Sequence, residues 1–262
     1  MNTRTIAVAN QKGGVGKTAI TVNLAARLAT EASRAVLVID SDAQANATDI
    51  LDAVPEPGEL NLNDILTAVA GGQAGPGCAA QAIRHAGPAW PGVDVLPAER
   101  SLASRETDIA PGREFRLRTA LEGVATAYNV VLIDCPPALG TLTLAALTAA
   151  DQVLIITEPR ASSVAGVAEL AATINTVRTY YNAQLEVAGI VLNKWRRDRH
   201  DRIAWRDELQ ATYGDLVIDH FLPEREVVAT AATNQVPVPH AEAGDWVNAL
   251  TAVARHLTQE NK

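Results

Sequence analysis

Hydrophobic residues along this chain are concentrated in short uninterrupted runs that alternate with longer stretches of helical spacing. The runs are bounded by polar residues, glycine or proline, which is typical of strands buried on both faces of a sheet. They occupy residues 6–9, 35–39, 93–97, 129–134, 152–157 and 187–193. The pattern therefore predicts six buried strands.

Between these runs, apolar residues recur every three or four positions, as they do on the core-facing side of a helix. The helices expected from this spacing cover residues 19–29, 140–147, 162–181 and 246–257. Strands and helices thus alternate from the beginning of the chain, which predicts an α/β fold. We expect a doubly wound, mainly parallel sheet with helices on both faces, because crossovers between parallel strands are right-handed.

Residues 55–92 are the least regular part of the chain, since glycine and proline interrupt them repeatedly. Within them, Asn61 or Asn63 is a plausible N-cap for a short helix. The segment has no hydrophobic core of its own, so we interpret it as an irregular elaboration between strands. Residues 1–262 are then expected to form a single domain.

Composition narrows the possible functions. The net charge of −8 argues against a surface that binds nucleic acid over its whole extent, so any such contact requires a local patch. Cys78 and Cys135 are too few for a disulfide framework or a four-cysteine metal site. No apolar segment approaches the roughly 18 residues needed to span a membrane. We expect a cytoplasmic protein that does not bind membranes.

The candidate chemistry begins directly after the first predicted strand, at Lys12-Gly13-Gly14-Val15-Gly16-Lys17-Thr18. Glycines allow backbone N–H groups to close around an anion, and the following helix adds the partial positive charge of its N-terminus. In such a loop Lys17 neutralises phosphate oxygens, and the Thr18 hydroxyl is a ligand for Mg²⁺. Because a strand precedes the loop and a helix follows it, we interpret it as a phosphate-binding loop.

Three aspartates follow predicted strands. Asp40 and Asp42 end the run at 35–39, and Asp134 ends the run at 129–134. In open α/β sheets, ligands bind at the carboxyl ends of the strands, so these carboxylates are expected beside the phosphate loop. Asp134 occupies the Walker B position and would hold Mg²⁺ opposite Thr18. One member of the Asp40/Asp42 pair has the alternative role of a helix cap.

The loop departs from the usual G-x-x-x-x-G-K-[ST] pattern, because Gln11 replaces the first glycine and a second lysine, Lys12, precedes the glycines. This deviant Walker A box resembles that of the ParA/MinD class of partition and positioning ATPases. Residues 43–48 and the run from Asp134 to Asn193 are similar to that class too. Two positions differ, since Ala43 stands for a proline and Ala45 for a glycine, which implies a change in loop stiffness.

The resemblance implies Mg²⁺-dependent binding and weak hydrolysis of ATP to ADP. It assigns catalytic roles to Lys17, to Lys12, which reaches the phosphates of the partner subunit, and to Asp42, which positions water. Mg²⁺ is expected on Thr18 and Asp134, with indirect support from Asp40. The residues expected to contact nucleotide are Lys12, Gly13, Gly14, Val15, Gly16, Lys17, Thr18, Ala19, Asn193 and Pro223. Asn193 has the alternative role of a turn-capping amide.

Residues 194–206 form the one locally basic segment, with six basic residues against Asp198 and Asp201. By resemblance to ParA proteins, this segment is expected to bind DNA without sequence preference. The predicted contacts are Lys194, Arg196, Arg197, Arg199, Arg202 and Arg206, together with Arg225. A solvated helix face is the alternative. Val227 stands where relatives carry a DNA-contacting arginine, and two glutamates, Glu224 and Glu226, lie beside it in the sequence.

The sequence thus predicts a ParA-like ATPase that partitions plasmid or chromosomal DNA. It would form an ATP-dependent homodimer on nucleoid DNA, and a ParB-like centromere-bound partner would stimulate hydrolysis. The alternatives are a MinD-like regulator of division, a metabolic P-loop enzyme, and a scaffold that binds nucleotide without hydrolysis. The MinD alternative requires a basic amphipathic last helix, whereas only Arg255 and Lys262 are basic there.

Overall fold

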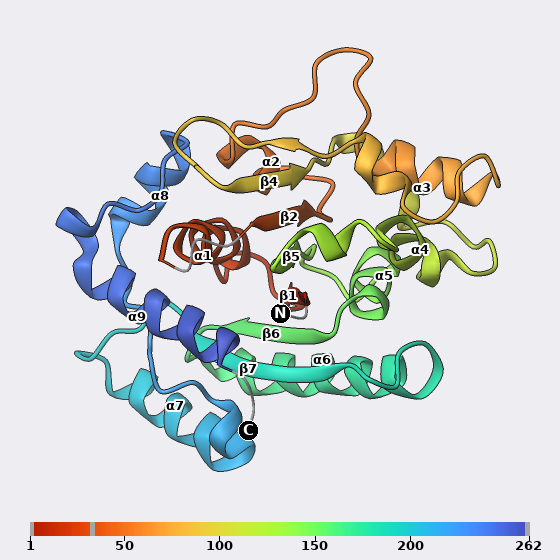
Figure 1. The fold of residues 1–262 in the computed structure, drawn as a ribbon. Helices are drawn as coiled ribbons and strands as arrows, with labels where there is room; N and C mark the ends of the chain where they lie inside the picture. The colour runs from red at the N-terminus through yellow and green to blue at the C-terminus, as the bar shows by residue number, and fades with distance from the viewer. Residues whose placement is uncertain (1–2, 32–34, 260–262) are drawn as a thin grey trace.

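The computed structural model describes residues 3–31 and 35–259, and its centre is one seven-stranded sheet (Figure 1). The strand order is β3-β4-β2-β5-β1-β6-β7. The strands are β1 (Arg4–Ala9), β2 (Val36–Asp40), β3 (Arg84–His85), β4 (Val93–Leu96), β5 (Val130–Asp134), β6 (Gln152–Thr157) and β7 (Glu186–Leu192). Lys262, counted above among the basic residues of the last segment, lies outside the described residues.

All strand pairs are parallel except that of β3 with β4, which confirms the predicted mainly parallel sheet. Each of the six predicted strands is present. The two-residue edge strand β3 was not predicted, because two residues carry no periodic signal. In the register of the sheet, Asp40 of β2 is the direct neighbour of Asp134 of β5.

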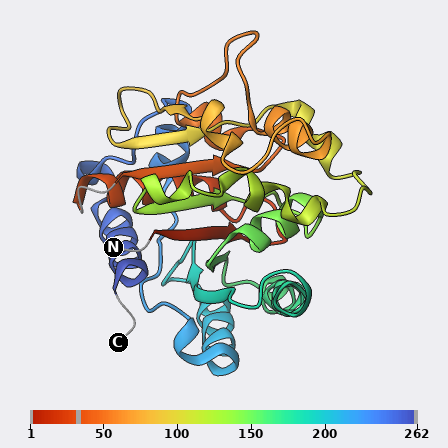
Figure 2. The ribbon, with the colours of Figure 1, turned by 45° about the vertical axis from the view of Figure 1, so that its right-hand side comes forward.

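Helices cover both faces of the sheet (Figures 1 and 2). One face packs against α1 (Lys17–Glu31), α2 (Asn46–Ile50), α8 (Glu226–Thr233) and α9 (His240–Thr258). The other face packs against α3 (Leu62–Ala70), α4 (Arg116–Leu121), α5 (Thr141–Ala149), α6 (Ala161–Tyr180) and α7 (His200–Tyr213). Side chains alternate across each strand, so Ile6 and Val8 face the first group whereas Ala7 and Ala9 face the second.

Residues 100–121 contain little α-helix. Short 3₁₀ turns lie at Arg100–Arg105 and Arg113–Phe115, and within this segment only α4 is α-helical. Arg116 is buried and pairs with Asp108, which Arg105 also approaches at 3.7 Å. Asp108 therefore provides the partner that the buried cation of Arg116 requires, whereas Arg100 and Arg118 are exposed.

Residues 55–92 pack on the sheet and contribute to its core through Leu62, Ile65 and Leu66 of α3. Asn61 is the N-cap of α3, and it forms a capping box in which its side chain accepts from the backbone of Asn63. The prediction of a capped helix here is confirmed. A cap of this kind satisfies N–H groups that the first helical turn leaves without a partner.

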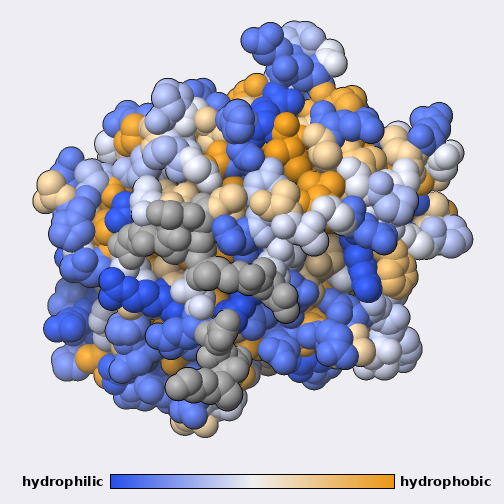
Figure 3. Space-filling model, viewed as in Figure 1, coloured by the Kyte–Doolittle hydropathy of each residue, from blue (hydrophilic) through white to orange (hydrophobic). Residues whose placement is uncertain are grey.

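None of the described helices is long and apolar enough to cross a membrane. Hydrophilic residues cover most of the face drawn in Figure 3, with hydrophobic residues in smaller groups among them. The predicted apolar stripe of α9, from Trp246 to Leu257, is buried against the sheet and α1. This packing agrees with the interpretation of the last helix as part of the domain core.

The loop between β2 and α2 contains a residue in a left-handed conformation. Ala45 has φ +55° and ψ +30°, at the position where the resemblance expects glycine. A side chain in this region costs about 1–2 kcal/mol relative to a right-handed conformation. The loop is therefore strained next to Asp42, whose carboxylate accepts from the backbone N–H of Gln44.

We predict that Ala45→Gly leaves the free energy of unfolding within about 0.5 kcal/mol of the wild-type value. Relief of the left-handed strain offsets the lost methyl packing and the greater entropy of the unfolded chain. The matched control is Ala47→Gly, in the buried part of α2, which is expected to lose more than about 1 kcal/mol. Urea denaturation measures both, and equal losses at the two positions would contradict the strain.

Candidate functional site

The phosphate loop connects β1 to α1 and is shaped by glycine. Gly14 and Gly16 have φ of +75° and +93°, values that side chains rarely adopt. A Cβ atom at Gly16 would also come within 2.3 Å of the Asn193 amide nitrogen. Residue 16 must therefore be glycine for the loop to pack against the end of β7.

Lys17 is buried at the first position of α1. Its ammonium lies 3.4 Å from the carbonyl oxygen of Lys12, so the side chain folds back over the loop. Burial lowers the pKa of Lys17, and the carboxylate of Asp134 acts in the opposite direction. A partly desolvated cation above a ring of backbone N–H groups is a suitable site for a phosphate.

Asp134 and Asp40 lie side by side at the carboxyl ends of β5 and β2, as their register requires. Asp134 accepts hydrogen bonds from the hydroxyls of Thr18 at 2.7 Å and Thr21 at 3.1 Å. Burial and, to a smaller extent, the nearby Asp40 raise the pKa of Asp134 to about 7. Burial also raises the pKa of Asp40 to about 6. The backbone N–H and the hydroxyl of Thr48 both donate to this carboxylate, which acts in the opposite direction.

This arrangement fits a magnesium ion. Two buried carboxylates and the Thr18 hydroxyl supply hard oxygen ligands, and Mg²⁺ is commonly held by one or two carboxylates together with phosphates and water. Within residues 3–31 and 35–259, no group of three or more His, Cys, Asp or Glu side chains is arranged to hold a metal ion. Phosphates and water would therefore complete the coordination of Mg²⁺ at Asp134.

Lys12 lies at the rim of the loop and contacts its own subunit. Its backbone N–H donates to the Asn10 side chain at 2.9 Å, and its ammonium donates to Ser162 Oγ at 3.0 Å. Ser162 belongs to the first turn of α6. The predicted reach of Lys12 into a partner subunit would therefore replace this contact with Ser162.

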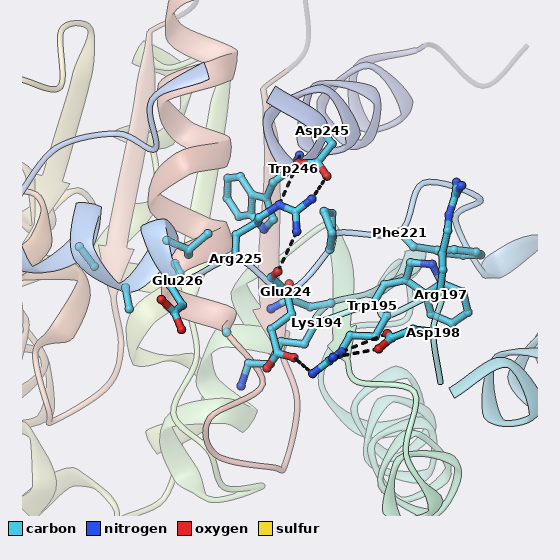
Figure 4. Close-up of a pocket in the computed structure, with 18 residues that line it drawn as sticks. Lys194, Trp195, Arg197, Asp198, Phe221, Glu224, Arg225, Glu226, Asp245 and Trp246 are labelled. Atoms are coloured by element: carbon cyan, nitrogen blue, oxygen red, sulfur yellow. Dashed lines mark hydrogen bonds and ion pairs between the residues drawn. The ribbon is translucent and has the colours of Figure 1, made fainter. Parts of the chain in front are cut away.

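A cavity of about 1290 Å³ opens beside the loop (Figure 4). Four of the ten residues expected to contact nucleotide line it, namely Gly16, Ala19, Asn193 and Pro223. Asn193 is buried, and its amide donates to the carbonyl of Val15 at 2.8 Å. Asn193 thus supports the loop directly, a role beyond that of a cap at the end of β7.

Four of the seven predicted DNA contacts, Lys194, Arg196, Arg197 and Arg225, line this cavity. Among the described residues, only two of the seven are exposed and form no ion pair. Arg196 pairs with Asp198, Arg206 with Asp207 and Arg225 with Asp245, and Figure 4 shows the last of these pairs. Arg202 is only 8% exposed, so its predicted DNA contact is wrong for this conformation. The two exposed residues are Arg197 and Arg199.

Lys194 lines the same cavity as Arg196, Arg197 and Arg225, but its contacts differ from theirs. Its ammonium donates to the carbonyl of Gly14 and pairs with Glu158 at 2.8 Å. The basic composition of residues 194–206 suggested a DNA contact for it, whereas the structure places it against the phosphate loop.

Sequence reasoning missed four residues of the site: Asn10, Thr21, Glu158 and Ser162. A usable signal existed for Glu158, because it follows a buried strand directly, as Asp40 and Asp134 do. Thr21 lies one helical turn after Lys17, on the side of α1 that meets β5. Asn10 and Ser162 carry no comparable signal in a single sequence.

Comparison with known proteins agrees with this geometry. Residues 3–187 match the AAA domain family. The chromosome partitioning protein ParA of Caulobacter vibrioides is 36% identical over 239 residues, which are 90% of this chain and 86% of that protein. The sporulation initiation inhibitor protein Soj of Bacillus subtilis is 34% identical over 235 residues, which are 89% of each chain.

Among solved structures, cobyrinic acid a,c-diamide synthase from Mycobacterium smegmatis, with bound ATP analogue and magnesium, gives a TM-score of 0.81. It is 28% identical, and the match covers 97% of this chain and 93% of that chain. The match to the AAA domain family, the partition relatives and the glycine loop with its two lysines agree with one another. The chain therefore belongs to the ParA/MinD-type deviant Walker ATPases.

Proposed function

We propose that this protein is a ParA-like ATPase that hydrolyses ATP and partitions DNA. The observation that carries the proposal is the joint placement of two lysines and two buried carboxylates around one glycine loop. Partition relatives support the biological role, since ParA and Soj match nearly the whole chain. The direct test is ATP turnover measured with and without DNA, and absence of turnover would leave a scaffold that only binds nucleotide.

In the proposed reaction, Lys17 and the loop N–H groups bind the phosphates and fix the terminal phosphate for in-line attack. Thr18 and Asp134 would hold Mg²⁺, with Asp40 oriented behind them by Thr48. The ion supplies charge neutralisation for the phosphate oxygens when bound. Asp42, at the edge of the same cluster, accepts a hydrogen bond from the attacking water and orients it.

Lys12 supplies the second cation from the neighbouring subunit in this proposal. Charge delivered in trans stabilises the transition state in the manner of an arginine finger. Nucleotide then becomes part of the contact between two subunits, so ATP binding and dimerisation are coupled. Hydrolysis, stimulated by a ParB-like protein, would dissolve the homodimer.

Binding to nucleoid DNA is proposed to depend on Arg197 and Arg199, the exposed members of the basic segment that lack an ion pair in the described structure. Phosphate contacts of this kind are insensitive to sequence and weaken with salt. The net charge of −8 restricts such binding to a local patch.

A metabolic P-loop synthase is the second candidate, because the cobyrinic acid a,c-diamide synthase structure is similar at 28% identity. The large cavity beside the loop is compatible with a second substrate. The partition function is preferred, because ParA and Soj share higher identity over a comparable length. Cys78 and Cys135 are both buried, which disfavours an iron–sulfur cluster shared between subunits.

We predict that Lys12→Ala abolishes ATP-dependent dimerisation but changes the affinity for an ATP analogue less than threefold. Within residues 3–31 and 35–259, the Lys12 ammonium donates only to Ser162 Oγ, so the phosphate site of the monomer remains intact. Light scattering and nucleotide titration measure the two effects. Lys17→Ala is the control that loses nucleotide binding itself, and an ATP-dependent dimer of Lys12→Ala would rule out the role in trans.

A second prediction concerns Asp134→Asn. The raised pKa means that the wild-type ligand-free protein loses stability between about pH 4 and pH 7, as the buried carboxyl ionises. The variant should therefore be more stable than the wild type at pH 8, by more than about 1.4 kcal/mol, the equivalent of one pKa unit. The difference should vanish near pH 4.

Mg²⁺ is expected to increase the affinity of the wild type for an ATP analogue. In the same Asp134→Asn variant, this increase should be at least tenfold smaller. Chemical denaturation across pH and titrations with and without Mg²⁺ measure both effects. A variant that is less stable than the wild type at pH 8 would show that the carboxylate is well solvated, contrary to its burial.

For DNA, the double change Arg197→Ala and Arg199→Ala is expected to weaken binding by a similar factor for every sequence. It should also reduce the slope of log affinity against log salt by about 2, one for each lost phosphate contact. Arg196→Ala is the matched control, because Asp198 already pairs with that arginine. Equal losses in the control and the double variant would assign the effect to net charge.

A further inference from the structure

The end of β7 supports the phosphate loop with two consecutive side chains. Asn193 donates to the carbonyl of Val15 at 2.8 Å, and Lys194 donates to the carbonyl of Gly14 at 2.5 Å. Lys194 has φ +54°, a left-handed conformation that is unusual for a lysine. The backbone turn thus allows neighbouring side chains to reach neighbouring carbonyls.

Glu158 fixes the position of the lysine. It follows β6, whose last residue Thr157 pairs with Leu192 at the end of β7, so the two strand ends are adjacent. The Glu158 side chain is only 5% exposed, and its two oxygens pair with Lys194 at 2.8 Å and Arg160 at 2.6 Å. A buried carboxylate of this kind requires cations nearby, and the proposed hydrolysis makes no other use of it.

The geometry of the peptide bond converts these contacts into control of the anion site. In a planar trans peptide, the C=O and N–H bonds point in opposite directions. When the carbonyls of Gly14 and Val15 are held toward β7, the N–H groups of Val15 and Gly16 point away from it, into the loop. Glycine at 14 and 16 leaves these peptides free to rotate, so an external restraint has a large effect.

We propose that Lys194, oriented by Glu158, is a positioning residue of the nucleotide site, which keeps the loop N–H groups directed at the phosphates. The inference rests on the proposed function, because it assumes that the loop binds a nucleoside triphosphate. It replaces the DNA-contacting role that composition suggested for Lys194. Pre-organisation of this kind increases affinity by removing an ordering cost from the binding step.

The test is titration of the full-length chain with a fluorescent, non-hydrolysable ATP analogue and with inorganic tripolyphosphate as a competitor. Lys194→Ala and Lys194→Met are expected to weaken both ligands at least tenfold and by the same factor, because the restraint acts on the phosphate loop. Lys194→Arg, which keeps a cation, should recover affinity to within threefold. Arg118→Ala, which removes an exposed cation of α4 and so the same net charge, is the control and should bind as the wild type does.

Glu158→Gln examines whether the carboxylate acts through the lysine. It is expected to weaken the ATP analogue three- to tenfold, and the double variant Glu158→Gln/Lys194→Ala should be no weaker than Lys194→Ala alone. Thermal unfolding of each ligand-free variant shows whether it is folded. If Glu158→Gln does not fold, the Lys194 variants still test whether Lys194 restrains the loop. The Lys194 side chain is 34% exposed, so its replacement is compatible with folding.

Four results would overturn the proposal. If Lys194→Ala bound the ATP analogue with wild-type affinity, the ammonium would not restrain the loop. The same conclusion would follow if Lys194→Met bound the analogue as tightly as Lys194→Arg does. A loss confined to DNA affinity would return Lys194 to the DNA surface. Failure of the wild-type protein to bind the ATP analogue would overturn the proposed function as well, so the two failures are distinguishable.

Discussion

Burial of negative charge at the carboxyl edge of the sheet is the constraint on which the site depends. The parallel register makes Asp40 and Asp134 neighbours, and both lie out of contact with water. Two desolvated carboxylates side by side are unfavourable without compensating groups. Thr18, Thr21 and Thr48 supply hydrogen bonds, and Lys17 supplies a cation whose own charge burial opposes. A divalent cation bound beside Asp134 would offset the remaining negative charge of this pair.

The backbone of the phosphate loop is also held in position by residues outside the loop. The phosphate loop has glycines where rotation is easiest, and the neighbouring strand ends limit that rotation from outside. Asn193 and Lys194 hold carbonyls on one side, while Asn10 accepts from the backbone of Lys12 on the other. The loop is therefore shaped as much by β6 and β7 as by its own sequence.

The hydrophobic pattern contained enough information for the sheet, its six longer strands and its two helical layers, because burial on both faces imposes uninterrupted apolar runs. The loop and its carboxylates were also predictable, since each lies directly beside such a run. The partners of the basic residues were not. Arg202 and Arg225 have similar local composition, yet one is buried and the other pairs with Asp245, twenty residues away. Contacts of this kind are set by tertiary packing, which no local window contains.

The resting position of Lys12 has a consequence for the speed of assembly. Its bond to Ser162 is exposed to water, where a single hydrogen bond has a net worth of only about 0.5–1.5 kcal/mol. An exposed lysine side chain released from such a bond samples its rotamers within nanoseconds. If two nucleotide-loaded subunits pair as proposed, their encounter would therefore not wait for this lysine to become free, and diffusion and alignment of the two surfaces would set the barrier.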